Sequence, residues 1–201
     1  MINKKISNFI SKLDITKINN NRKKTLNSLI NYIRLNYINN PIYLNFICTH
    51  NSRRSQLCQI LFKTISSYYN KSDIFSYSGG TEVTEVYKTI ILSLKNIGFD
   101  IVKIKDEINP IYHIKYDNNN EPILCFSKLY NSEINPTNNY IAVINCNTAD
   151  INCPIVSGAT KRFVIPFNDP KEYDGKKEEY VEYNNSLKEI ARDLKYILLK
   201  I

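Results

Sequence analysis

The chain has 201 residues, 43% of them hydrophobic, which is enough for one well-packed domain with an appendage and excludes global disorder. Its formal net charge of +8 suits a protein that attracts small oxyanions or acidic partners. The lysines are spread along the chain without a stripe of arginines and aromatic residues, which argues against nucleic-acid binding. No apolar run reaches the length of a membrane span, and the N-terminus lacks the apolar core of a signal peptide.

The cysteines indicate the compartment. Their number, five, is odd, and their spacing is not that of a small disulfide-rich secreted domain. Reduced thiols in the cytoplasm fit this pattern best, and a reactive thiolate would need such an environment. The five are Cys48, Cys58, Cys125, Cys146 and Cys153.

The first part of the chain predicts helices. Residues 1–38 show two stretches of apolar residues at helical spacing, separated near residues 19–21. We therefore treat residues 1–40 as an N-terminal helical extension. Packing of these helices onto the rest of the protein is favoured over a role in binding a partner, and both remain open at this point.

From residue 41 to residue 201 the pattern is that of one α/β domain. Strands and helices alternate, and such alternation predicts a central parallel sheet flanked by helices, in three layers. Residues 105–135 depart from the alternation and resemble a hairpin, which we interpret as an insertion near the rim of the active site. The strands are expected at 42–48, 74–77, 99–104 and 139–145, and the helices at 55–69, 84–97 and near 177–199.

The most informative stretch begins at Cys48, where an apolar strand ends. A tight polar loop and an amphipathic helix follow, and five residues separate Cys48 from Arg54. The backbone N–H groups of such a loop converge on one point, where a tetrahedral anion binds with help from the arginine and the helix N-terminus. Cys48 would lie beneath the anion as a nucleophile, its thiolate favoured by the same charges and by the Ser55 hydroxyl. The residues expected to bind the oxyanion are Thr49, His50, Asn51, Ser52, Arg53, Arg54 and Ser55.

The alternative is a buried structural cysteine followed by a solvated pair of arginines. A cysteine and an arginine at this spacing occur by chance, but the strand before the loop, the Asn51-Ser52 pair within it and the helix start after it make the functional interpretation stronger.

The segment Cys48-Thr-His-Asn-Ser-Arg-Arg-Ser-Gln resembles the anion loop of the low-molecular-weight protein tyrosine phosphatase family, and most closely its arsenate reductase branch. The resemblance continues through Ser78-Gly-Gly-Thr81 and covers roughly residues 41–200. It implies a phosphotyrosine phosphatase I-like fold. Many relatives carry another cysteine before the loop arginine, where this chain has Arg53.

A second constellation follows the strand predicted at 139–145. Cys146 and Cys153 are seven positions apart, roughly 10.5 Å along a regular helix, so a disulfide between them requires the intervening segment to loop out or unwind. Their surroundings resemble the redox segment of thioredoxin-coupled arsenate reductases. The resemblance implies that Cys146 attacks the adduct on Cys48 and that Cys153 resolves the resulting disulfide. Two unrelated core thiols or a zinc pair are the alternatives, and zinc is disfavoured because both histidines lie far away in the sequence.

The family places an acid on an Asp-Pro loop, and Asp169-Pro170 matches it. Asp169 would protonate a leaving oxygen and later activate water. We expect an arsenate reductase with a three-cysteine relay, no bound cofactor or metal, and thioredoxin or a similar dithiol as external reductant. The alternative enzyme is a phosphatase that hydrolyses phosphotyrosine through a phosphocysteine. The Lys171-Glu-Tyr173 segment weakens that alternative, because the phosphatases often have adjacent tyrosines there. A non-enzymatic oxyanion sensor with the same fold is the third possibility.

Overall fold

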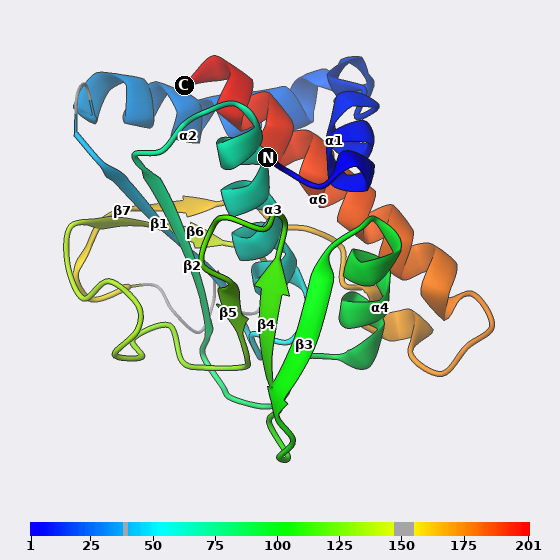
Figure 1. Cartoon of the computed structure of the whole chain (residues 1–201). Helices are drawn as coiled ribbons and strands as arrows, with labels where there is room; N and C mark the ends of the chain where they lie inside the picture. The colour runs from blue at the N-terminus through cyan, green and yellow to red at the C-terminus, as the bar shows by residue number, and fades with distance from the viewer. Residues whose placement is uncertain (38–39, 147–154) are drawn as a thin grey trace.

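The computed structural model describes residues 1–37, 40–146 and 155–201. Its centre is a four-stranded sheet in the order β2-β1-β6-β7, and each neighbouring pair runs parallel. The carboxyl ends of β1 and β6 therefore lie side by side (Figure 1). The bounds are Ile42–Cys48 for β1, Ile74–Gly80 for β2, Tyr140–Ile144 for β6 and Ala159–Val164 for β7.

Helices flank this sheet and build the larger of two apolar cores. Leu44 and Phe46 of β1 point into that core, while Ile47 points to the opposite face and a smaller cluster that includes Val156. This alternation is expected of a strand buried on both sides. The predicted parallel sheet flanked by helices is confirmed. The helices are α1 (Lys4–Ser11), α2 (Asn20–Asn36), α3 (Arg54–Tyr68), α4 (Lys88–Asn96) and α6 (Glu179–Lys200), with short 3₁₀ turns η1 (Ile15–Lys17) and η2 (Pro170–Tyr173).

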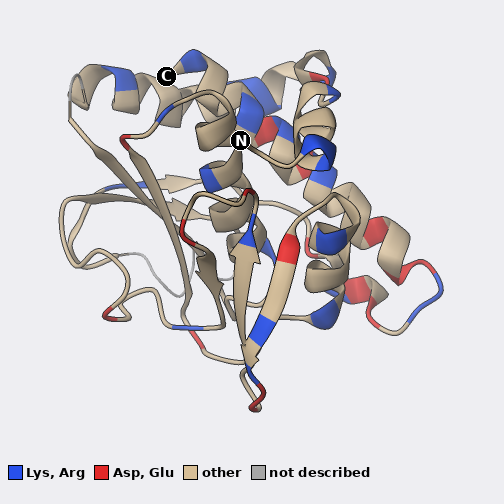
Figure 2. Cartoon of the chain, viewed as in Figure 1, with Lys and Arg blue, Asp and Glu red and all other residues tan. Residues whose placement is uncertain are grey.

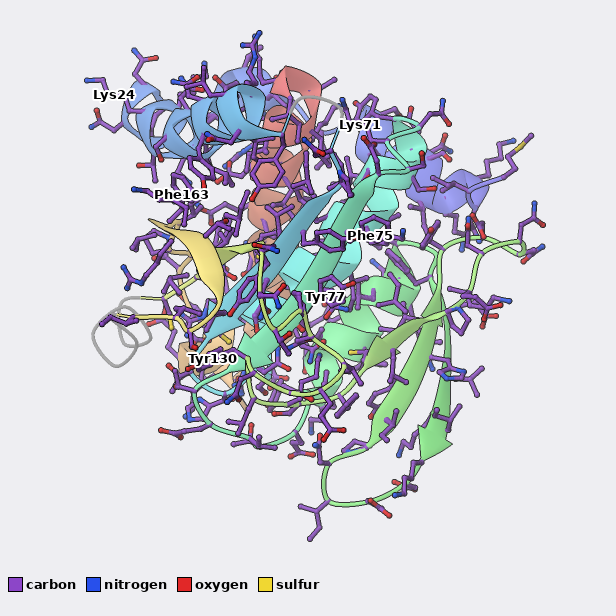
Figure 3. The ribbon with its side chains drawn as sticks, turned by 90° about the vertical axis from the view of Figure 1, so that its left-hand side faces the viewer. Lys24, Lys71, Phe75, Tyr77, Tyr130 and Phe163 are labelled. Carbon is purple, nitrogen blue, oxygen red and sulfur yellow. The ribbon has the colours of Figure 1, made fainter. Side chains whose placement is uncertain are left out.

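The N-terminal helices pack onto the domain. Asn19 caps α2 by accepting a hydrogen bond from the backbone N–H of Arg22 at 2.8 Å, which satisfies one of the free amides of the first turn. The helix lies over β7, where the rings of Tyr32 and Phe163 are 5.4 Å apart; Figure 3 shows Phe163 below α2. The apolar residues of the two helices join the larger core; they are Ile6, Ile10, Leu26, Leu29, Ile30 and Ile33.

The strand predicted at 99–104 does not belong to the parallel sheet, and that expectation was wrong. It forms β3 (Asp100–Lys105), which pairs antiparallel with β4 (Ile111–Lys115), and β4 pairs antiparallel with β5 (Ile123–Cys125). Of β3 only Ile101 is buried, so the strand suits a small sheet with one wet face better than the middle of a doubly covered one. The hairpin predicted within 105–135 is present as β4 and β5.

Strand β7 was not anticipated. It is one of the two edge strands of the parallel sheet, and its Lys161 and Arg162 interrupt the apolar pattern that identifies central strands. Figure 2 shows that lysines and arginines are distributed over helices, strands and loops, in line with the spread along the sequence. Within the described residues, no helix is both long and apolar enough to cross a membrane.

Candidate active site

Cys48 is the last residue of β1, and only 3% of its surface is exposed. Its sulfur lies 3.0 Å from the hydroxyl oxygen of Ser55 in the first turn of α3. The same hydroxyl accepts a hydrogen bond from the side-chain amide of Asn51 at 2.8 Å. That bond uses the oxygen as an acceptor and leaves the hydroxyl proton available for a hydrogen bond to the Cys48 sulfur.

The Asn51 side chain is itself held in one orientation. Its carbonyl oxygen accepts from the amide of Gln56 at 2.9 Å and from the backbone N–H of Lys128 at 3.1 Å. These two donors fix which end of the Asn51 amide faces Ser55. Asn51 also has a φ of 49°, a left-handed conformation that asparagine tolerates well and that turns successive N–H groups toward one point.

Carbonyl groups of the anion loop accept hydrogen bonds from neighbouring segments. The backbone N–H groups of Thr81, Glu82 and Tyr87 donate to the carbonyls of residues 48, 49 and 52 at 3.2, 2.8 and 3.2 Å. The Ser127 hydroxyl donates to the carbonyl of residue 50 at 2.7 Å. These bonds occupy the carbonyl groups of the loop and fix its backbone, so an anion would be bound by the N–H groups of the loop. The helix predicted at 84–97 begins only at Lys88, and Tyr87, directly before it, donates its N–H to the loop.

Gly80 allows this close approach of backbone to backbone. A Cβ at Gly80 would lie 2.6 Å from the carbonyl oxygen of Thr49 and 2.9 Å from the nitrogen of Asn51. Both distances are shorter than real contacts, and both partners are backbone atoms that define the loop. The glycine of the Ser78-Gly-Gly-Thr81 segment is therefore required by the packing of β2 against the anion loop.

Arg54 and Asp169 are brought together across 115 positions of sequence. The Arg54 Nη2 donates to Asp169 Oδ2 at 2.5 Å, and Nη1 donates to the carbonyl oxygen of Phe167 at 3.3 Å. Asp169 also caps η2 by accepting from the Lys171 N–H at 3.1 Å. Arg54 Nε is buried and has no hydrogen-bond partner among the described residues. The acid expected from the sequence thus lies against the arginine of the anion loop.

Arg53 points elsewhere. Its Nε donates to the hydroxyl of Tyr183 at 2.5 Å, it forms an ion pair with Asp174, and its guanidinium lies 4.2 Å from the centre of the Tyr87 ring. Burial raises the pKa of Tyr183, which keeps that hydroxyl neutral as it donates to Asp174. Of Arg53, only the backbone remains for an oxyanion.

The other loop residues have mixed surroundings. The His50 side chain lies 3.2 Å from Glu82, on the partly exposed side of the loop, and Ser52 is buried. The Thr49 hydroxyl lies 3.5 Å from the sulfur of Cys146. Thr49 therefore connects the anion loop to the second cysteine segment.

Cys146 follows β6 and is 2% exposed, in the same apolar cluster as Cys48. Ile47, directly before Cys48, pairs in register with Ile144, the last residue of β6 and two positions before Cys146, so the two cysteines lie at neighbouring strand ends. Cys153 lies outside the described residues. Cys58 and Cys125 are fully buried, as expected of small hydrophobes, and burial raises the pKa of the Cys125 thiol to about 12.

Several residues that support the site were not identified from the sequence. Gln56 and Ser127 hold the loop, and Tyr183 and Asp174 hold Arg53. Apart from Gln56, which follows the loop directly, they come from distant parts of the chain. Their residue types are ordinary at those positions, so no local pattern distinguishes them.

The chain is similar in sequence to curated arsenate reductases. No family model matches the chain. Arsenate reductase 2 of Staphylococcus epidermidis RP62A is 30% identical over 125 residues, which cover 62% of this chain and 76% of that protein, and an arsenate reductase of S. epidermidis ATCC 12228 matches to the same extent.

Solved structures agree on the fold. Arsenate reductase from Archaeoglobus fulgidus superposes with a TM-score of 0.52 at 19% identity, over 77% of this chain and 98% of that one. A low-molecular-weight phosphotyrosine phosphatase from Vibrio cholerae O395 gives 0.53 at 11% identity, over 79% and 94%. With the geometry of Cys48, Arg54 and Asp169, these relatives show that the chain belongs to the low-molecular-weight phosphatase family, in its arsenate reductase branch.

Proposed function

We propose that the protein is an enzyme that reduces arsenate to arsenite through Cys48, Cys146 and Cys153, with thioredoxin or a similar dithiol in the cytoplasm as the external reductant. The curated relatives carry the name arsenate reductase. The observation that supports the relay in this chain is the burial of Cys146 beside Thr49, at the strand end next to that of Cys48. A phosphatase has no need of a second thiol there.

The first step forms a bond between sulfur and arsenic. Arsenate binds to the N–H groups of residues 49–55 and to Arg54, and the Cys48 thiolate attacks arsenic(V). A hydroxyl group leaves as water after taking a proton from Asp169, whose carboxyl lies against Arg54. Residues 49–55 thus bind, Cys48 is the nucleophile and Asp169 is the acid.

The electrons then come from thiols. The Cys146 thiolate attacks the sulfur of Cys48, the sulfur–arsenic bond breaks, and its electron pair stays on arsenic, which leaves as arsenite. Cys153 attacks the sulfur of Cys146, which frees Cys48 and leaves a Cys146–Cys153 disulfide. The external dithiol reduces this disulfide by two electrons, so atoms and charges balance over one turnover.

The test is NADPH oxidation with thioredoxin and thioredoxin reductase, in the presence of arsenate, run beside hydrolysis of para-nitrophenyl phosphate. Cys146→Ser should abolish arsenate-dependent oxidation and leave any phosphate ester hydrolysis nearly intact, because hydrolysis needs only Cys48, Arg54 and Asp169. Cys58→Ala is the matched control, because Cys58 is fully buried on α3 and burial raises the pKa of its thiol well above the usual value, which disfavours the thiolate that exchange requires.

Two results would contradict the proposal. Arsenate turnover that survives in Cys146→Ser would exclude the relay. Ester hydrolysis by the wild type without arsenate-dependent oxidation would make the protein a phosphatase, the alternative that shares the first step. Oxyanion binding without either turnover would indicate a sensor.

A further inference from the structure

The segment that carries Asp169 is held by three arginines, and one of them lies outside the family-like domain. Arg54 binds Phe167 and Asp169, and Arg53 binds Asp174. The third is Arg22, in the first turn of α2. Its Nη1 donates to the carbonyl oxygen of Pro166 at 2.9 Å, and its guanidinium lies over the ring of Phe167, 4.6 Å from the ring centre.

The Arg22 side chain is held in its orientation by an ion pair with Asp193 of α6. Its Nε donates to Asp193 at 2.6 Å, and the side chains of Arg22 and Asp193 are only 18% and 1% exposed. The planar guanidinium meets a carboxylate, a carbonyl and an aromatic face from one position, which an ammonium group cannot do. Pairing with Asp193 therefore fixes the direction in which Arg22 reaches Pro166 and Phe167.

Phe167 connects Arg22 to the segment that carries Asp169. Its N–H donates to the carbonyl of Asn145 at 3.1 Å, directly before Cys146, and its carbonyl accepts from Arg54. Phe167 is buried, with 6% of the residue exposed. Arg22, Phe167 and Arg54 thus form a continuous set of contacts from the N-terminal helix to Asp169.

We propose that Arg22 is a positioning residue for Asp169, so that the N-terminal helix α2 takes part in catalysis by holding residues 166–169 against the anion loop. The consequence for turnover rests on the proposed function, whereas the consequence for residues 166–174 does not. A misplaced acid slows the attack on the anion, while the anion loop itself, which Arg22 does not touch, still binds.

The test compares Arg22→Lys with Lys195→Gln in the full-length protein. Lysine keeps the positive charge opposite Asp193. It lacks the several N–H donors of the guanidinium that reach Asp193 and Pro166 together, and the planar face that lies over the Phe167 ring. Lys195 is the matched control because its amine also links α6 to the N-terminal region, through the carbonyls of Ile10 and Leu13 at 2.9 and 2.8 Å, without touching residues 166–174.

Three quantities are measured. The first is amide hydrogen exchange in residues 166–174, where the Phe167 and Lys171 amides are hydrogen-bonded. The second is the rate of arsenite formation in a single turnover of the reduced protein, which needs no thioredoxin. The third is arsenate binding, measured as protection of Cys48 from alkylation.

For Arg22→Lys we expect faster exchange in this segment and about tenfold slower arsenite formation, since misplacing a general acid costs a large part of its effect. Arsenate protection should stay within about twofold of the wild type, because binding to the loop is separate from proton transfer. Lys195→Gln should lower the melting temperature and leave exchange in 166–174 and the single-turnover rate unchanged.

Unchanged exchange in Arg22→Lys would overturn the inference, and so would faster exchange with an unchanged single-turnover rate, because the contact would then be merely structural. A wild-type protein that forms no arsenite would contradict the proposed function instead. In that case amide hydrogen exchange in residues 166–174 would show by itself whether Arg22 holds this segment, and unchanged exchange in Arg22→Lys would overturn the inference. If Arg22→Lys does not fold, the double variant Arg22→Met with Asp193→Leu replaces the buried pair by apolar side chains, a change that is often tolerated, and the same outcomes apply.

Discussion

At the scale of single residues, Cys48 depends on a short series of hydrogen bonds. Ser55 touches its sulfur, Asn51 touches Ser55, and Gln56 and Lys128 fix Asn51. The bonds to Gln56 and Lys128 fix which end of the Asn51 side chain faces Ser55. The sequence predicted the Ser55 contact, because the residue lies at the start of the helix after the loop. The orientation of Asn51 was not predictable, since Lys128 is 77 positions away.

Ser55→Ala should reduce the reactivity of Cys48. Loss of the hydroxyl removes a donor to the thiolate, so alkylation by iodoacetamide at pH 6 should slow by about three- to tenfold, the equivalent of roughly 1 kcal/mol, the usual net worth of one hydrogen bond. The rate is followed by mass spectrometry of the Cys48 peptide. Ser66→Ala is the control, since Ser66 is a buried serine of the same helix whose hydroxyl binds the Lys71 carbonyl. Equal rates in the wild type and Ser55→Ala would contradict this role.

At the scale of elements, the hairpin region does more than extend the domain. After β5 the chain returns to the site, where Phe126 and Lys128 bind Gln56 and Asn51. The Lys128 amine is then buried against β2, 3.3 Å from the Ser78 hydroxyl, and burial lowers its pKa from 10.5 to about 8. The hairpin itself was predictable from its turn residues. Its attachment to the anion loop was not, because it depends on how two sheets meet.

The buried amine gives stability a defined pH dependence. Between about pH 8 and pH 10.5 the folded protein holds fewer protons than the unfolded chain, so its stability rises with pH across that window. Below about pH 8 the amine is charged in both states, and the full free-energy cost of burying the charged amine lowers the stability of the folded protein. Lys128→Met removes this cost. The excess stability of the variant over the wild type should therefore shrink by about 3 kcal/mol from pH 7 to pH 10.5, at about 1.4 kcal/mol per pKa unit.

Urea unfolding at several pH values measures this difference, with the exposed Lys24→Met as the control for removing a surface lysine. A difference between Lys128→Met and the wild type that stays constant from pH 7 to pH 10.5 would show that the amine does not titrate in this window.

At the scale of the whole molecule, the N-terminal helices and the domain share one core. Residues of α1 and α2 pack with those of α3, α6 and the sheet, and Arg22 and Lys195 add polar links between α6 and the N-terminal region. The helical face of α2 was predictable from its periodicity. The surface that this face covers was not, since periodicity gives the direction of burial and not the partner.

Two leucines of α2 test this arrangement. Leu29 is fully buried and Leu35 is 79% exposed, so Leu29→Ala should lower the free energy of unfolding by about 2–5 kcal/mol and Leu35→Ala by less than about 0.5 kcal/mol. Chemical denaturation of the full-length variants measures both. Similar small losses would mean that α2 contributes little to the common core.

The sequence by itself predicted three of the four parallel strands, β1, β2 and β6, together with the cysteine and arginine of the anion loop and Asp169 as the candidate acid. Apolar runs, turn residues and the spacing around Cys48 are local, and local patterns survive in the sequence. Only the tertiary structure decided that β3 leaves the parallel sheet, that Arg53 faces Tyr183 and not the oxyanion, and that Arg22 reaches the acid segment. These contacts join residues more than 100 positions apart or depend on which edge of a sheet is free, and their energy comes from burial that exists only once the chain has folded.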